Sequence, residues 1–209
     1  MLNLIIKDIA VQKKTIPLAL LYVVFFLVLA GEAYKKGSIY VIGVTLTYMF
    51  SLGAMQYDER YKADCIIASL PVNRKDIVIS RYLATIFFTA ASTAFMLIIT
   101  WVMSIFNVMP SISWTNIHDL KLIIVISLLL MAVIIPLNYR FSAKKVRYIN
   151  VLSYLAFFFV IISFYDESQI FFNSSLMLFL KQYSVLLSVA AFAVSIGCSL
   201  LIYQNKDLV

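Results

Sequence analysis

The residues with the chemistry for binding or catalysis are concentrated in one short stretch of the chain, residues 58–76. No proline or glycine interrupts the sequence between Gln56 and Leu70, so a short helix with one apolar face is expected there. Such a helix beside many charges suits the binding of a partner protein. The alternative is a solvated linker whose charges only orient the neighbouring segments. The charged residues of the stretch are Asp58, Glu59, Arg60, Lys62, Asp64, Arg74, Lys75 and Asp76.

The sequence contains no recognisable catalytic constellation. The single histidine, His118, has no matching partner for nucleophilic or metal chemistry, and Cys65 and Cys198 lack the spacing of a metal site. No zinc-protease, serine-hydrolase or phosphate-binding motif occurs, and the whole chain has only 5 glycines. We therefore expect no enzymatic activity, no metal and no cofactor in this chain.

The composition indicates a membrane protein. Of 209 residues, 63% are hydrophobic and 13% are charged, whereas a soluble domain carries about a quarter charged residues. A soluble protein of this size has no interior large enough for that much apolar surface, so lipid is expected to cover the rest. The net charge of +7 comes from clusters between apolar runs, which argues against nucleic-acid binding.

Charge-free runs of the chain are long enough for transmembrane helices, because a span needs about 20 apolar residues. The third run is the longest, and its second part contains Pro110 and several turn formers. We expect one span followed by an outer loop there, rather than a hairpin of two short helices. The runs are continuously apolar rather than alternating, which predicts helices and not strands. The runs are Thr15–Gly31, Ser38–Tyr57, Tyr82–His118, Leu122–Tyr139, Tyr148–Tyr165 and Gln182–Asn205.

The positive residues predict the topology. With six spans and a cytoplasmic N-terminus, thirteen of the 17 lysines and arginines lie on the cytoplasmic side and four lie outside, which is the positive-inside bias. An extra span in the third run would move the cluster Arg140–Arg147 outside. We therefore predict an all-α membrane protein, a single transmembrane domain over residues 1–209, with six transmembrane helices, both termini cytoplasmic, and outer loops at 107–119 and 166–181. The thirteen are Lys7, Lys13, Lys14, Arg60, Lys62, Arg74, Lys75, Arg81, Arg140, Lys144, Lys145, Arg147 and Lys206, and the four are Lys35, Lys36, Lys121 and Lys181.

Residues 1–14 are predicted to form an amphipathic helix on the membrane surface. Lys7, Lys13 and Lys14 fall towards the side opposite the apolar stripe, where anionic lipid would attract them. The alternative is an N-terminal extension of the first span. Pro17 lies where either a new helix begins or the chain bends into the membrane. The apolar stripe comprises Leu2, Ile5, Ile6, Ile9 and Ala10.

Two further local patterns predict structure around the spans. Asn73 suits an N-cap and Asp76 follows three residues later, so the third transmembrane helix is expected to begin at Arg74. Small residues recur at helical spacing and predict close helix packing in lipid. They are Gly43, Thr47 and Ser51, then Ala90 and Ala94, then Ser188, Ala191, Ser195 and Ser199.

Glu59 and the run Ser69–Leu83, which reads SLPVNRKDIVISRYL, resemble a known family. They are similar to the cytoplasmic loop and the start of the third span in ABC-2 type transporter permeases. The opening Asn3–Asp8 looks like the N-terminal surface helix of that family, and the likeness in length, span number and orientation covers most of the chain. Arg81 stands where the family pattern has lysine, which preserves the positive charge.

The resemblance implies a multi-pass subunit of an ABC exporter in the bacterial cell membrane. It would pair with a second permease, as a homodimer or heterodimer, and with two cytoplasmic ATPases that bind ATP and magnesium. The loop at 58–73 would be the coupling helix held in a groove of the ATPase. Segment Asp166–Lys181 is similar to a partly re-entrant element, with an ordinary outer loop as the alternative. The implied ATPase contacts are Glu59, Tyr61, Lys62, Leu70, Pro71, Arg74 and Lys75.

The implied mechanism is alternating access driven by the ATPase, and the implied cargo is an amphipathic peptide, an antibiotic or a lipid-like molecule. A six-span substrate-binding membrane subunit of a vitamin importer is the alternative function, and it would bind its small molecule without a partner. A membrane enzyme without a recognised motif and a scaffold without a transport role are further alternatives.

Overall fold

The computed structural model describes residues 2–29, 35–61, 73–105, 117–141, 143–165 and 183–204, and their regular structure is helical. A first helix, α1 (Leu2–Val11), continues into the short 3-10 helix η1 (Gln12–Lys14). The longer helices are α2 (Ile16–Leu29), α3 (Lys35–Arg60), α5 (Arg74–Ile105), α6 (Ile117–Arg140), α7 (Ala143–Tyr165) and α9 (Ser184–Gln204).

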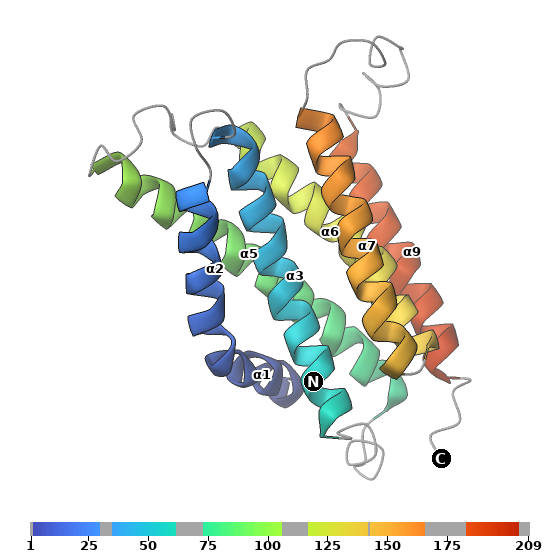
Figure 1. Ribbon diagram of the computed structural model, residues 1–209. Helices are drawn as coiled ribbons and strands as arrows, with labels where there is room; N and C mark the ends of the chain where they lie inside the picture. Colours follow the sequence, from blue (N-terminus) through green and yellow to red (C-terminus); the bar gives the residue numbers. More distant parts are fainter. Residues whose placement is uncertain are drawn as a thin grey trace.

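The longer helices run in alternating directions along one bundle (Figure 1). Helix α1 lies crosswise at one end, the end at which α3 finishes, α5 begins and α9 finishes. Among the described residues, each predicted apolar run contains one long helix or most of it, and the third run also reaches the start of α6; an uninterrupted apolar stretch in lipid favours helical hydrogen bonding. The number of spans stays a prediction.

The N-terminal residues form a separate helix and do not extend the first span. The η1 turn closes with a hydrogen bond of 2.8 Å from the Thr15 amide to the Gln12 carbonyl. Helix α2 then begins at Ile16, with Pro17 in its first turn. Proline is favourable there because the first amides of a helix have no intrahelical acceptor. The chain therefore changes direction between α1 and α2.

The predicted start of the third long helix at Arg74 is confirmed. The Asp76 amide donates to the Asn73 carbonyl at 2.9 Å, and Asp76 places an acidic side chain in the first turn, where the helix dipole favours it. Helix α5 then runs unbroken to Ile105. The first part of the third run is thus one helix, as predicted.

The helices extend into several segments that the sequence predicts as loops. Helix α3 continues through Arg60, so Asp58 and Glu59 belong to its last turn. Helix α6 begins at Ile117, so residues 117–119 are helical. Residues 62–72, 106–116 and 166–182 lie outside the described residues, and with them the predicted coupling helix, most of the first outer loop and the re-entrant element.

Small residues allow close packing of α3, α6 and α9 at the core. A Cβ added to Gly43 would lie 3.0 Å from Cγ2 of Ile123, whose side chain is fully buried. The small-residue prediction is confirmed for Thr47 and Ser51 in α3 and for Ser188, Ser195 and Ser199 in α9, which are all buried. It is wrong for Ala90 and Ala94, which are exposed because α5 presents Thr85, Thr89, Ser92 and Met96 to the core instead.

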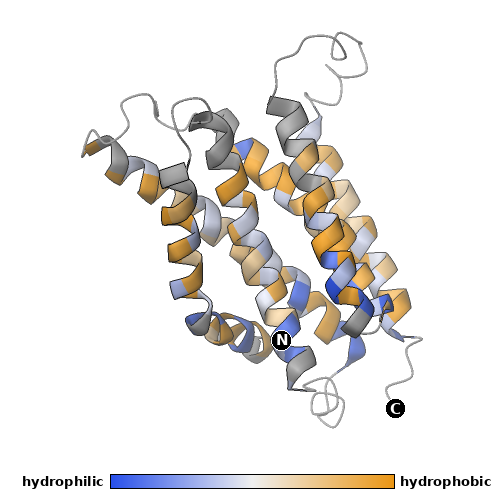
Figure 2. Cartoon of the chain, in the orientation of Figure 1, coloured by the Kyte–Doolittle hydropathy of each residue, from blue (hydrophilic) through white to orange (hydrophobic). Residues whose placement is uncertain are grey.

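The outer surface of the bundle is strongly apolar. Among the described residues, three helical segments are long and apolar enough to cross a membrane: Arg74–Val102, Leu120–Arg140 and Ser184–Gln204. A shorter apolar segment is Ile16–Phe25. Only 22% of the window in α9 is buried inside the protein, so most of that helix needs lipid around it. Hydrophilic residues gather at the end that holds α1 (Figure 2).

Candidate functional site

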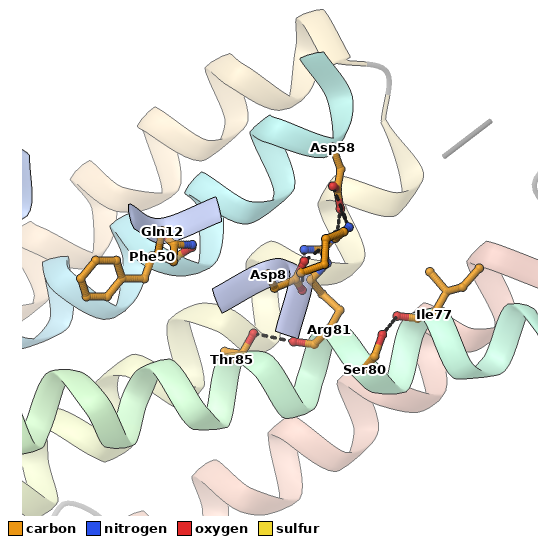
Figure 3. A network of polar contacts seen from close by, with 9 residues as sticks. Asp8, Gln12, Phe50, Asp58, Ile77, Ser80, Arg81 and Thr85 are labelled. Carbon is orange, nitrogen blue, oxygen red and sulfur yellow. Dashed lines mark hydrogen bonds and ion pairs between the residues drawn. The ribbon is translucent and has the colours of Figure 1, made fainter. Parts of the chain in front are cut away.

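Four charged side chains from three helices meet at the α1 end of the bundle (Figure 3). Lys7 and Asp8 come from α1, Asp58 from the last turn of α3, and Arg81 from α5. The Lys7 ammonium lies 2.8 Å from each carboxylate oxygen of Asp58 and 3.5 Å from Asp8. The Arg81 guanidinium binds Asp8 through Nη1 at 3.0 Å and Asp58 through Nη2. We call this group the ion cluster.

The ion cluster is balanced in charge, and its two carboxylates are buried while Lys7 keeps part of its side chain exposed. Asp8 and Asp58 are 3% and 5% exposed, and the side chains of Arg81 and Lys7 are 12% and 32% exposed. Each carboxylate contacts both cations. An unpaired buried charge costs several kcal/mol, roughly 3–5 when one partner of a buried pair is removed, so the members depend on one another.

Helix position explains why the carboxylates need these cations. Asp58 lies in the last turn of α3, where the partial negative charge of the helix end disfavours a carboxylate. Lys7 and Arg81 offset that effect from two other helices. Burial raises the pKa of Asp8 above its ordinary value, and the opposing influence of Arg81 and then of Lys7 is smaller. The ion cluster therefore positions α1 against α3 and α5 at a cost in desolvation.

A second polar contact attaches the other end of α1. The Gln12 amide nitrogen donates to the Phe50 carbonyl of α3 at 2.6 Å, and Gln12 is 5% exposed. A Cβ added to Gly53 would lie 3.5 Å from the Gln12 amide oxygen, an ordinary van der Waals contact, so the Gln12 side chain lies directly against this part of α3. Leu4 also packs against the main hydrophobic core.

The face of α1 that packs on the protein differs from the predicted apolar stripe. It follows Leu4, Asp8 and Gln12, at four-residue spacing, while Ile6 is 60% exposed. Lys7 points to Asp58 rather than away from the protein. The reason is that the partners of α1 are charges and a carbonyl, which bind polar side chains. Ala10 and Lys13 are exposed, and Ile9 packs against a small apolar cluster.

The predicted ATPase contacts divide into three groups. Tyr61, Arg74 and Lys75 are exposed at the ends of α3 and α5, at the same end of the bundle as α1. Glu59 lies in the last turn of α3, and its side chain is outside the described residues. Lys62, Leu70 and Pro71 also lie outside the described residues.

Two of the exposed contacts also interact within the protein. The Tyr61 ring lies 4.4 Å from that of Tyr57, one turn earlier. The Arg74 guanidinium donates to the Gln204 carbonyl at 2.8 Å. Gln204 ends α9, whose last carbonyls have no intrahelical donor, so Arg74 joins the start of α5 to the end of α9.

Sequence reasoning did not select the ion cluster as a site. Its members are noted separately in the sequence, Lys7 as a topology charge on an amphipathic helix, Asp58 as part of the charged stretch 58–76 and Arg81 in the family resemblance, and nothing there places them together. A usable signal exists in hindsight: Asp8 lies inside an apolar helix and Asp58 at the end of an apolar run, where an acidic group is costly without a cation.

The comparisons with known proteins agree with these features. The chain matches the family described as ABC-2 family transporter protein over residues 3–204. No curated protein and no solved structure matches the chain at a significant level. Because the family match covers nearly all of the 209 residues, this chain belongs to the ABC-2 family of transporter proteins.

Proposed function

We propose that this protein is the membrane-spanning permease subunit of an ABC transporter whose ATP hydrolysis takes place in a separate cytoplasmic ATPase. The proposal includes six transmembrane helices, α2, α3, α5, α6, α7 and α9, with both termini in the cytoplasm of a bacterial cell. The family match, the apolar outer surface and the alternating helix directions support it.

The ion cluster is the observation that carries the mechanism. Asp58 and Arg81 lie on the two helices that flank residues 62–72, and both are paired with α1. The loop proposed to contact the ATPase therefore has a base in which α1, α3 and α5 are joined. A force on the loop would move these helices together, because separating them exposes unpaired buried charges.

In this mechanism, ATP binding closes the ATPase dimer and displaces the loop. The two permeases, either identical or different, then shift about their interface and change which side of the membrane the pathway faces. The contact residues are Glu59, Tyr61, Lys62, Leu70, Pro71, Arg74 and Lys75.

The interior of the bundle supports a partner as the source of energy. Polar groups paired between described helices include the hydroxyls of Thr47 and Ser92 and the amides of Asn138 and Asn150. These groups do not carry the charge changes that drive ion-coupled carriers. We extend the proposal to export of an amphipathic peptide, an antibiotic or a lipid-like molecule, for which apolar and hydroxyl-bearing helix faces are suitable.

Co-purification tests the partner. The chain is co-expressed in a bacterial host with a tagged ABC ATPase from the same organism, and the expected result is a stable complex with ATPase activity above that of the ATPase alone. The double variant Glu59→Ala, Arg74→Ala should lose the complex. Lys13→Ala is the matched control, because Lys13 is an exposed cation on the same end of the protein but outside the loop.

Arg74 needs one further control because it also binds the end of α9. The unfolding temperature of the double variant is therefore measured without ATPase, and a fold close to that of the wild type assigns the lost association to the contact surface. A double variant that keeps both the association and the stimulated ATPase activity would contradict the contact assignment. Binding of a vitamin by the purified chain alone would instead favour the importer subunit.

A further inference from the structure

Pro136 lies inside α6, one turn before that helix ends at Arg140. Proline has no amide hydrogen, so the carbonyl of Ala132, four residues earlier, loses its usual intrahelical donor. The Ser195 hydroxyl of α9 donates to this carbonyl at 2.6 Å in a buried position. A side chain from another helix thus replaces the hydrogen bond that Pro136 removes.

Tyr82 of α5 joins this arrangement. Its hydroxyl lies 2.7 Å from the Ser195 hydroxyl and 2.7 Å from the Ser199 hydroxyl, and all three side chains are buried. Each hydroxyl has one hydrogen to donate. Because Ser195 donates to Ala132, Tyr82 donates to Ser195 and accepts from Ser199. The donated hydrogens therefore run in one direction, from Ser199 of α9 to Tyr82 of α5, from Tyr82 to Ser195 of α9, and from Ser195 to the Ala132 carbonyl of α6.

The position of Tyr82 next to Arg81 connects this chain of hydroxyls with the ion cluster. Arg81 contacts α1 and α3, whereas Tyr82 contacts α9, and its ring packs edge-on against Phe192 at 5.0 Å. Successive helix residues point about 100° apart, so one turn of α5 contacts two different sides of the bundle. Because Arg81 and Tyr82 are adjacent in α5, a movement of this turn that displaces Arg81 also displaces Tyr82.

The part of α6 that follows Pro136 has its own attachment. The side-chain amide nitrogen of Asn138 donates to the Ile134 carbonyl at 2.9 Å, and the side-chain amide nitrogen of Asn150 in α7 donates to the Asn138 side-chain oxygen at 3.1 Å. The end of α6 is therefore linked to α7 by a hydrogen bond, and its Tyr139 ring also packs edge-on against Tyr203 of α9 at 5.1 Å, while the Ala132 carbonyl is hydrogen-bonded to α9. Pro136 lies between the two hydrogen-bonded attachments, and the ring contact of Tyr139 with Tyr203 is a contact to α9 that remains beyond Pro136.

We propose that Ala132–Pro136 is a hinge in α6, held in the observed geometry by the Ser195 hydroxyl and positioned by Tyr82. Release of the Ser195 hydrogen bond lets the end of α6 and the attached start of α7 change direction relative to α9. The use of this hinge in transport rests on the proposed function, but the existence of the hinge does not.

A double-mutant cycle of unfolding temperatures in lipid nanodiscs tests the role of Pro136. S195A is expected to lower the unfolding temperature by about 2–4 °C in the wild-type background. P136A restores an amide that can donate to Ala132, so S195A should cost about half as much or less in that background. Equal losses in the two backgrounds would overturn the proposal. S195T keeps the hydroxyl and should retain most of the stability.

A distance measurement tests the hinge motion. Spin labels are placed by R140C and V185C, at exposed positions at the end of α6 and near the start of α9, with the native cysteines replaced by serine. S195A is expected to broaden the distance distribution, whereas the double variant S195A, P136A should restore a narrow one. An unchanged distribution in S195A would overturn the hinge.

A second label pair separates the hinge from general loosening of the bundle. I124C with L201C places the α6 label before Pro136, at exposed positions, so S195A should leave this distribution narrow. Equal broadening for both pairs would overturn the hinge in favour of a purely structural hydrogen bond. The measurement requires neither ATPase nor substrate, so a failure here is distinct from a failure of the proposed function.

Discussion

The Lys7 ammonium lies 2.8 Å from both carboxylate oxygens of Asp58, although the two residues are 51 positions apart in the sequence. This ion pair holds α1, at the start of the chain, against the last turn of α3. Together with Arg81 it makes the attachment of α1 depend on charge as well as on the apolar contacts of Leu4 and Ile9. The following predictions test how much the fold and the proposed mechanism rely on that attachment.

Asp58→Asn is expected to destabilise the protein by about 3–5 kcal/mol, because the largely buried Arg81 then shares one carboxylate, Asp8, with Lys7. Thermal unfolding in detergent or nanodiscs measures the effect. Asp76→Asn is the matched control, since Asp76 lies at the start of α5 and contributes through the helix dipole, about 0.3–1 kcal/mol. Similar losses for the two variants would show that the ion cluster is not a structural unit.

The pH dependence of the stability difference between the wild type and Asp8→Asn tests the electrostatic cost of burying the Asp8 carboxylate. Folding raises the pKa of Asp8 above 3.8, so the folded protein holds its proton to higher pH than the unfolded chain does. The protonated Asp8 therefore contributes to the free energy of unfolding below pH 3.8, and this contribution is lost as the pH rises through the pKa that Asp8 has in the folded protein.

The unfolding temperatures of the wild type and Asp8→Asn are compared at a series of pH values from 4 to 8, so that other titrating groups cancel. The advantage of the wild type should be largest at the acid end and should decrease as the pH rises. A difference that stays constant, or that grows with pH, would contradict the raised pKa.

The long helices are the part of the fold that the sequence predicts well. The run Gln182–Asn205 corresponds to α9 at Ser184–Gln204, and the break before Arg74 is placed correctly. Both successes have physical causes. A continuous apolar stretch in lipid has only helical hydrogen bonding available, and a capping pattern marks a helix start locally.

The packing face of α1 and the pairing within the ion cluster could not be predicted from sequence patterns, although the positions of Asp8 and Asp58 indicate that each needs a cation. Periodicity assumes that the buried face of a helix is its apolar face, but α1 buries Asp8 and Gln12 against α3 and α5. Which carboxylate meets which cation depends on the tertiary arrangement, and the chain offers 17 lysines and arginines. Local sequence carries no information about a pairing such as that of Lys7 with Asp58.

Gln12→Ala is expected to loosen α1 without unfolding the bundle. The lost hydrogen bond to the Phe50 carbonyl contributes about 1 kcal/mol, which corresponds to roughly fivefold faster opening. Hydrogen exchange of the α1 amides should accelerate by about that factor, while the exchange of α9 stays unchanged. Lys13→Ala, the exposed neighbour, is the control and should leave both rates as they are. Unchanged exchange in Gln12→Ala would show that this contact does not hold α1.

Gly43→Ala and Gly197→Ala form a matched pair within long helices. Alanine is favoured over glycine in a helix interior by about 0.5–1 kcal/mol, and both substitutions receive this gain. Nothing lies within 4 Å of a Cβ added to Gly197, so Gly197→Ala should raise the unfolding temperature slightly. A Cβ at Gly43 would lie 3.0–3.4 Å from three atoms of Ile123, so this fully buried side chain would have to shift to admit it.

Overpacking of this kind costs about 1–3 kcal/mol, so Gly43→Ala should be less stable than Gly197→Ala by about that amount. Combining Gly43→Ala with Ile123→Ala identifies the cause. The truncation of Ile123 removes all three contacting atoms, so the two changes should cost less together than the sum of their separate effects. Additive losses would show that α3 and α6 are free to separate at Gly43, and that close packing of these two helices is not what the glycine provides.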